Sequence, residues 1–203
     1  LSRRAVTDSL LSFAGTKDAR NGLEWGGVTE NGGRLGISYD DGEVGAYGYG
    51  EAHALRGNHV RSNSRAELGS GIYWYLLNDD ERMFTTGLSL TAMGYENNQN
   101  NFTYGNGGYF SPQQFVSLAI PMKWSQRGDK WSYSLQGSIG VQQIEQDSEP
   151  YFPNDKDMQR TLEQIAAAAK GLDLVAPTHF SDSNDTGVGY SLAASGEYRL
   201  GSN

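Results

Sequence analysis

Cysteine is absent from the 203 residues of this sequence, and so is any long apolar run. Without cysteine the sequence offers no disulfide, no cysteine-ligated metal site and no thiol catalysis. A membrane-spanning helix needs roughly 20 predominantly apolar residues, and no segment approaches that length. The sequence opens with Leu1-Ser2-Arg3-Arg4 instead of a signal peptide. For an exported protein we therefore expect the signal to lie upstream, with this sequence as a fragment.

Positive charge is also scarce. The 16 lysines and arginines face 24 aspartates and glutamates, which gives a net charge of -8 at pH 7. Because nucleic-acid binding depends on neutralising phosphates, we expect no nucleic-acid partner. The mean hydropathy of -0.59 is polar for a membrane protein. A membrane β-barrel nevertheless permits it, because only every second residue of a barrel strand faces lipid.

Glycine and tyrosine are plentiful, with 27 glycines and 12 tyrosines against 7 phenylalanines. Such a composition suits many strands joined by tight turns. Nothing resembles an interdomain linker, so we predict that residues 1–203 form a single domain. Residues 1–22 are predicted to be an irregular loop, and Asn31-Gly32 is predicted to be a hairpin turn. The predicted strands, about eight in number, are 23–29, 34–39, 43–55, 60–76, 83–95, 115–124, 131–142 and 188–199.

Alternation between apolar and polar residues is clearest in residues 60–76. Leu68, Ile72 and Trp74 share one face of this strand, while Glu67 and Tyr73 share the other. A period of two over so long a run is typical of a strand with one dry and one wet face. The later predicted strands repeat the pattern.

Three features favour a membrane barrel over a soluble sandwich. The strands exceed the usual length of about 5–6 residues. Aromatic residues lie near the ends of the dry faces, and tight turns alternate with long loops at 96–112 and 145–186, as in outer-membrane barrels. We therefore predict an all-β, antiparallel, up-and-down transmembrane β-barrel. The aromatic residues concerned are Trp74, Phe84, Trp124 and Trp131.

The insertion at 145–186 holds the one convincing helix, near residues 155–170. Asn154 is its predicted N-cap, and Gly171 follows its end. The helix carries an apolar stripe that we expect to pack on an adjacent loop or on the barrel wall, with partner binding as the alternative. The stripe comprises Met158, Leu162, Ile165, Ala166 and Ala169.

Four short stretches carry a resemblance to a known family. They are residues 6–15, 25–28, 149–153 and, most specifically, 101–113, which reads NFTYGNGGYFSPQ. The sequence resembles the C-terminal domain of cellulose synthase operon protein C, a family of outer-membrane exporters of bacterial cellulose. The resemblance implies a pore of about sixteen strands that passes a glucan chain, with the final strands absent here. It also implies periplasmic tetratricopeptide repeats earlier in the same polypeptide, absent here as well, and contact with outer-membrane lipid and the inner-membrane cellulose synthase complex.

Tyrosines and small polar groups on the wet faces are candidates for contacting a neutral sugar chain in the lumen. Arg61, Arg65 and Glu67 could instead pair across the barrel wall. Tyr73 and Tyr75 could instead anchor the barrel at the lipid interface. The complete set of lumen candidates is Tyr47, Tyr49, Arg61, Arg65, Glu67, Tyr73, Tyr75 and Gln136.

Aromatic residues in the loop at 96–112 are candidates for narrowing or gating the exit of the pore. The alternative is a loop that folds on its own aromatic side chains. The candidates are Phe102, Tyr104, Tyr109 and Phe110.

Catalysis has little support in the sequence. His53, His59 and His179 are isolated, with no metal-binding spacing, and no nucleophile elbow is present. Asp182–Asp185 could hold calcium loosely, but a solvated loop is the simpler interpretation. We therefore expect no enzyme, no cofactor and no metal. The alternatives to an export pore are a structural or adhesive barrel and a barrel enzyme acting on glycan or lipid.

Overall fold

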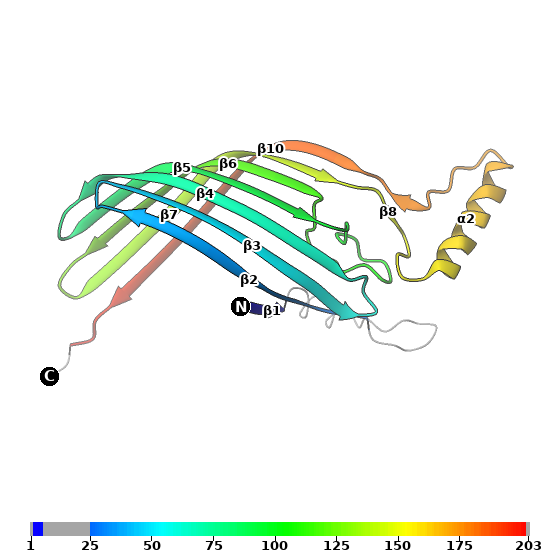
Figure 1. Ribbon diagram of the computed structural model, residues 1–203, viewed down its shortest axis with the longest axis horizontal. Helices are drawn as coiled ribbons and strands as arrows, with labels where there is room; N and C mark the ends of the chain where they lie inside the picture. Colours follow the sequence, from blue (N-terminus) through cyan, green and yellow to red (C-terminus); the bar gives the residue numbers. More distant parts are fainter. Residues whose placement is uncertain (1, 6–24, 202–203) are drawn as a thin grey trace.

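The computed structural model describes residues 2–5 and 25–201, which fold into a curved antiparallel sheet (Figure 1). Its eight strands follow the order β1-β2-β3-β4-β5-β6-β7-β10. The predicted all-β, up-and-down arrangement is confirmed, as is the helical insertion. In chain order the elements are β1 Ser2–Ala5, β2 Gly26–Asp40, β3 Val44–Asn58, β4 Asn63–Asn78, β5 Arg82–Tyr95, β6 Gln114–Arg127, β7 Trp131–Gln146, β8 Glu149–Pro150, α2 Lys156–Lys170, β9 His179–Phe180 and β10 Ser183–Tyr198.

The predicted hairpin at Asn31-Gly32 is wrong, because both residues lie inside the continuous strand β2. Gly32 pairs with His53 of β3, and a Cβ atom on Gly32 would come within 2.3 Å of the His53 ring. The glycine therefore makes room for a neighbouring ring and does not form a turn.

The prediction of an irregular N-terminal loop is wrong for Ser2–Ala5, which pair with residues 29–32 as β1. Residues 6–24, including the start of the first predicted strand, lie outside the described part. The two predicted strands 23–29 and 34–39 correspond to the single strand β2, and β1 was not predicted. The sheet therefore still has eight strands.

The three tight turns lie at one end of the sheet, and the two long connections lie at the other end together with the short β3–β4 connection (Figure 1). Residues 41–43, 79–81 and 128–130 form the three tight turns, as predicted within a residue or two. Residues 59–62, 96–113 and 147–182 connect the strands at the other end, which we call the loop end. This separation follows from the up-and-down order, because successive connections alternate between the two ends.

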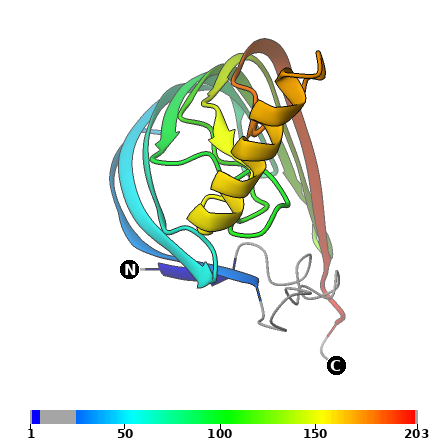
Figure 2. The same ribbon diagram turned by 90° about the vertical axis from the view of Figure 1, so that its right-hand side faces the viewer.

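The two faces of the sheet differ sharply in polarity. The apolar residues lie on the convex face, where Leu35 is 84% exposed and Leu68 is 67% exposed. The pairing register keeps residues of one face together across strands: Tyr49 pairs with Gly69, which pairs with Thr91. Viewed along the strands, the sheet arches around a concave face (Figure 2). The described apolar core is small and lies at the loop end, formed by Val28, Leu55, Val60 and Tyr109.

Helix α2 lies beyond the loop end, clear of the sheet in Figure 1 and across its open end in Figure 2. Its N-cap is Asp155, whose carboxylate accepts a 2.9 Å hydrogen bond from the Met158 amide, and not the predicted Asn154. Gly171 caps the other end, as predicted. The stripe does not pack on the wall of the sheet, and Ile165 is 59% exposed. No helix among the described residues is long and apolar enough to cross a membrane.

Candidate functional site

The concave face holds a cavity of about 580 Å³. Tyr47, Tyr73 and Tyr75 line it from β3 and β4, and Gln136 faces them from β7. These four residues are half of the predicted lumen candidates. Strands distant in the sheet thus present tyrosines on one side of the cavity and hydroxyl and amide groups on the other. The polar groups opposite the tyrosines include Lys123, Gln136, Ser138 and Ser191.

Tyrosine rings on the concave face lie against glycines of the neighbouring strand. A Cβ atom added to any of these glycines would lie only 2.1 to 2.6 Å from the nearest ring carbon. The rings therefore occupy the space that a side chain would need. Aromatic side chains that cover glycines in this way help to fix the strand register. The pairs are Tyr73 with Gly45, Tyr47 with Gly71 and Tyr49 with Gly69.

Three tyrosine hydroxyls of the concave face donate to carboxylates. Tyr73 and Tyr75 donate to Oδ2 of Asp40 at 2.6 and 2.7 Å. Tyr49 donates to Oε1 of Glu67 at 2.7 Å. These hydrogen bonds fix the ring orientations, so the tyrosines form an ordered part of the wall.

Arg65 lies in a charged cluster that joins β2, β3 and β4. Its guanidinium donates to Glu30 at 2.9 Å, to Glu51 at 2.6 Å and also to Glu67. The Arg65 side chain is only 12% exposed. His53 lies beside the same cluster, with Nδ1 3.6 Å from Glu30. Arg65 and Glu67 thus bond to each other along β4, while Glu30 and Glu51 bond to Arg65 from neighbouring strands, outside the residues that line the cavity.

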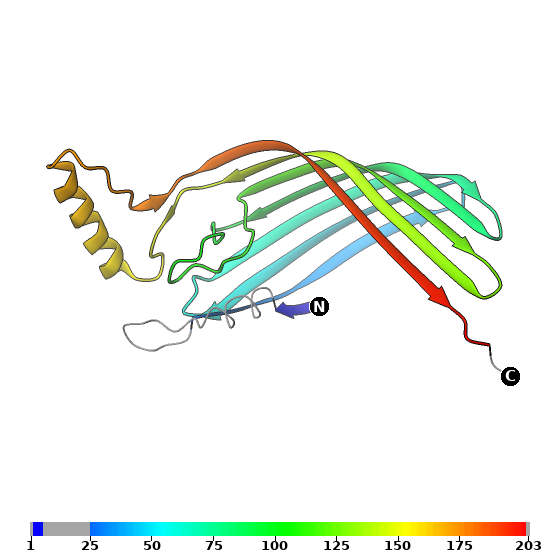
Figure 3. The ribbon, with the colours of Figure 1, turned by 180° about the vertical axis from the view of Figure 1, so that it is seen from behind.

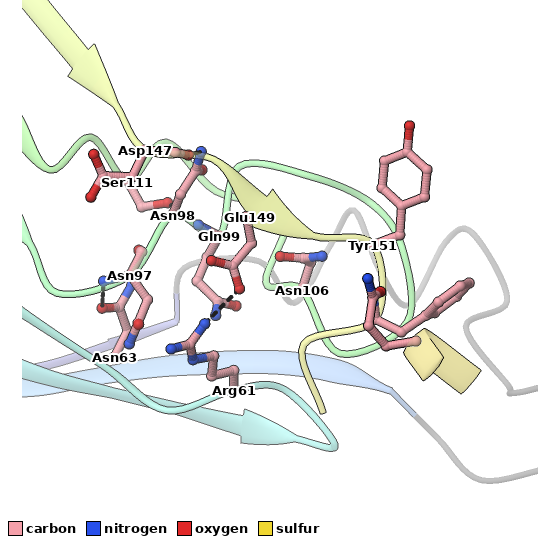
Figure 4. Close-up of polar contacts among 12 residues, drawn as sticks. Arg61, Asn63, Asn97, Asn98, Gln99, Asn106, Ser111, Asp147, Glu149 and Tyr151 are labelled. Atoms are coloured by element: carbon pink, nitrogen blue, oxygen red, sulfur yellow. Dashed lines mark hydrogen bonds and ion pairs between the residues drawn. The ribbon is translucent and has the colours of Figure 1, made fainter. Parts of the chain in front are cut away.

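Arg61 lies in the short β3–β4 connection at the loop end, away from the other lumen candidates. Its guanidinium donates a 2.6 Å hydrogen bond to Glu149, and its amide donates to the carbonyl of Gly105 (Figure 4). The Glu149 side chain is 6% exposed. Burial raises the pKa of Glu149, and Arg61 offsets part of that increase.

The loop at 96–113 folds onto the loop end through buried amides. Asn63 donates to the carbonyl of Asn97, and Asn98 donates to the carbonyl of Asp147, both at 2.8 Å (Figure 4). Gln99 and Asn106 are fully buried. The sequence reasoning missed these amides, although the density of asparagine in the loop was a signal that they would be used.

The four gating candidates occupy different environments. Tyr109 is buried, its hydroxyl accepts from Asn63 at 2.9 Å, and burial raises its pKa. Tyr104 contacts the rings of Trp25 and His59. Phe102 and Phe110 are exposed. Among the described residues, no group of three or more histidine, aspartate or glutamate side chains is arranged so that it could hold a metal ion.

A curved antiparallel sheet with an apolar convex face, a polar concave face and long loops at one end has the construction of a β-barrel wall. The family described as cellulose synthase operon protein C C-terminus matches residues 1–203. The chain therefore belongs to the cellulose synthase operon protein C family, in agreement with the resemblance of its motifs.

Curated relatives agree with the family match. The chain is 48% identical to cellulose synthase operon protein C of Pseudomonas fluorescens (strain SBW25), over 100% of this chain and 15% of that protein. It is 42% identical to cellulose synthase operon protein C of Xanthomonas axonopodis pv. citri, over 98% of this chain and 14% of that protein. A third relative, cellulose synthase 2 operon protein C of Komagataeibacter xylinus, is 34% identical. The chain thus spans about one seventh of the length of these relatives.

Proposed function

We propose that this chain forms part of an outer-membrane pore through which a β-1,4-glucan passes from the periplasm to the cell surface. The chain's family ties it to cellulose biosynthesis. The observation that carries the proposal is the inversion of polarity, with exposed apolar residues outside and polar residues inside the curved sheet. Lipid on one side and water on the other would stabilise such a sheet.

The convex face has the dimensions of a membrane band. On β7 the outward apolar residues run from Trp131 to Val141, ten residue steps. At about 3.4 Å per residue and a tilt of about 40°, these steps rise about 26 Å, close to the apolar band of outer-membrane barrels. Trp74, Phe84 and Trp124 lie with Trp131 toward the turn end, where one aromatic girdle would meet the membrane interface.

The concave wall suits a neutral polysaccharide because much of it is neutral. Positions that face inward on β6, β7 and β10 carry hydroxyl and amide groups, which exchange hydrogen bonds with sugar hydroxyls without holding the chain tightly. The fixed charges of this part of the wall are held by one another, with Arg65 shared among the carboxylates of Glu30, Glu51 and Glu67, and the cluster keeps a net negative charge to which a neutral sugar chain is indifferent. The neutral positions include Ser117, Ser134, Gln136, Ser138, Gln142, Ser191 and Ser195.

The open edge of the sheet supports further strands of the same polypeptide. Strand β10 pairs only with β7 among the described strands, and it runs along the free edge in Figure 3. A long unpaired edge is a template for another strand. We propose a barrel of about sixteen strands, preceded by periplasmic repeats and linked to the inner-membrane synthase. We also propose that its role is transport without catalysis.

To test this proposal, the lumen of the full-length protein is obstructed by attaching a bulky group to a residue that lines the cavity. Ser138 lines the cavity, and its neighbour Ile139 is 50% exposed on the convex face. Ser138→Cys, labelled with a bulky maleimide in a cellulose-producing strain, should reduce secreted cellulose. Ile139→Cys labelled in the same way is the matched control and should leave secretion unchanged. Normal secretion of cellulose by a fully labelled Ser138→Cys variant would contradict the proposal that the glucan passes through this pore.

A second candidate function is adhesion, and exposed apolar residues beyond the sheet favour it. Leu172 is 75% exposed and Val175 is 97% exposed, both in the segment after α2. Such residues could bind a surface partner. Adhesion predicts that Val175→Asp weakens attachment of cells to a surface while cellulose secretion is unchanged.

A further inference from the structure

We propose that Tyr47 and Tyr73 form a flat stacking platform for the sugar rings of a passing β-glucan, a role that rests on the proposed pore. The starting observation is the register between β3 and β4. Three consecutive inward-facing pairs each consist of one tyrosine and one glycine. The tyrosine comes from β4 in the first pair and from β3 in the next two, so the rings lie over both strands.

The glycines determine how the tyrosines lie. A Cβ atom on Gly71 would be 2.6 Å from the Tyr47 ring, and one on Gly45 would be 2.1 Å from the Tyr73 ring. Each ring therefore rests against the backbone of the next strand and does not stand up into the cavity. A ring held against the wall narrows the lumen least, and both Tyr47 and Tyr73 line the cavity.

The three tyrosines are not equivalent, because only two of them line the cavity. Tyr47 and Tyr73 do so, while Tyr49 does not. The guanidinium carbon of Arg34 lies 3.5 Å from the centre of the Tyr49 ring and so covers one of its faces. Two of the glycine-paired rings are thus accessible, and the third tyrosine that lines the cavity, Tyr75, pairs with Thr85 and not with a glycine. The two accessible rings occupy adjacent inward pairs, about 7 Å apart along the strands.

The chemistry of the cavity matches a β-linked glucan. Its pyranose rings present C–H groups on flat faces, and these are attracted to the electron-rich face of an aromatic ring. Its hydroxyl groups lie around the ring edges, where Gln136, Ser138 and Ser191 on the opposite wall can exchange hydrogen bonds. Two rings and a few neutral partners give a weak site, as conduction requires.

The experiment uses the full-length protein in planar bilayers, with cellohexaose as the probe. We expect cellohexaose to interrupt the ionic current and the Tyr47→Ala/Tyr73→Ala variant to shorten those interruptions about tenfold, which corresponds to about 1.4 kcal/mol. Tyr190→Ala is the matched control, because Tyr190 is 86% exposed on the convex face. Tyr49→Ala should have a smaller effect than either platform tyrosine. Tyr47→Phe/Tyr73→Phe keeps both rings and should keep the long interruptions.

A glycine variant tests the same geometry from the other side. Gly71→Val should lift the Tyr47 ring into the cavity and lower the open-pore current, and adding Tyr47→Ala should restore it. Interruptions of unchanged length in every correctly assembled tyrosine variant would overturn the platform while leaving the pore intact. A pore that conducts without any interruption by cellohexaose would also overturn the platform. A full-length protein that forms no conducting pore would overturn the proposed function itself.

Discussion

Arg61 and Glu149 are 88 residues apart in the chain and form a 2.6 Å ion pair between the β3–β4 connection and the start of the long insertion. Removing the arginine would leave a buried carboxylate without this partner. We expect Arg61→Ala to lower the free energy of opening the loop end by about 1–3 kcal/mol. Amide hydrogen exchange at Gln99 and Asn106 would measure the opening. Glu149→Gln, which removes the buried charge, should have a smaller effect, and unchanged exchange in Arg61→Ala would contradict the prediction.

Glu149 also predicts a pH dependence of loop opening. Burial raises its pKa above the ordinary value of 4.5, so the folded loop binds the proton more tightly than the unfolded loop does. A bound proton therefore favours the closed loop. The stability that the proton gives to the closed loop is fully present below pH 4.5, the ordinary pKa. It is lost as the pH rises through the raised pKa of Glu149 in the folded loop. The protection factors of the loop amides, which are exchange rates corrected for the intrinsic pH dependence of amide exchange, should fall over that interval. Glu149→Gln should remove this fall in protection, and its persistence in that variant would assign it to another group.

Arg65 should matter most to stability among the charged residues of the wall. Its replacement by leucine would leave Glu30, Glu51 and Glu67 without their shared cation. We expect a loss of about 3–5 kcal/mol in unfolding free energy, as for other broken buried ion pairs. Urea unfolding of the full-length protein in lipid would measure the loss. Arg34→Ala is the control, because the Arg34 side chain is 57% exposed and should contribute less than about 1 kcal/mol.

The lipid-facing role of the convex face predicts opposite outcomes for neighbouring residues. Leu135→Arg would place a charge near the middle of the proposed membrane band and should cost about 2–4 kcal/mol. Gln136→Arg points the same charge into the cavity and should cost little. Comparing the two variants by unfolding in lipid vesicles would test the assignment of faces. Equal stability of both variants would contradict it.

The faces of the later strands could be predicted because a period of two is a local property of the sequence. The sequence immediately around Leu68 and Glu67 is enough to assign each residue to one face of the strand. The tyrosine–glycine pairs could not be predicted, since they depend on the register between β3 and β4. The same limit explains the error at Asn31-Gly32: the dipeptide has a turn signature, but His53 on another strand determines its conformation.

The loop residues show a second limit of sequence reasoning. Tyr104, Tyr109 and the phenylalanines shared one aromatic signature, yet Tyr109 is buried while Phe102 is 62% exposed. Which aromatic residue enters the interior depends on partners far along the chain, such as Asn63. Helix α2 was predictable from its caps and stripe, within one residue at its start, but its position beyond the sheet was not.

The three connections at the loop end are fastened to one another. Arg61 of the first connection bonds to Gly105 of the second and to Glu149 of the third, and Asn98 of the second bonds to Asp147 of the third. Each connection is thus bonded to both others. Moving one of them away from the sheet would therefore break or strain its bonds to the remaining two. Opening this end should accordingly be an all-or-none event, with a steep dependence on any force or ligand that drives it.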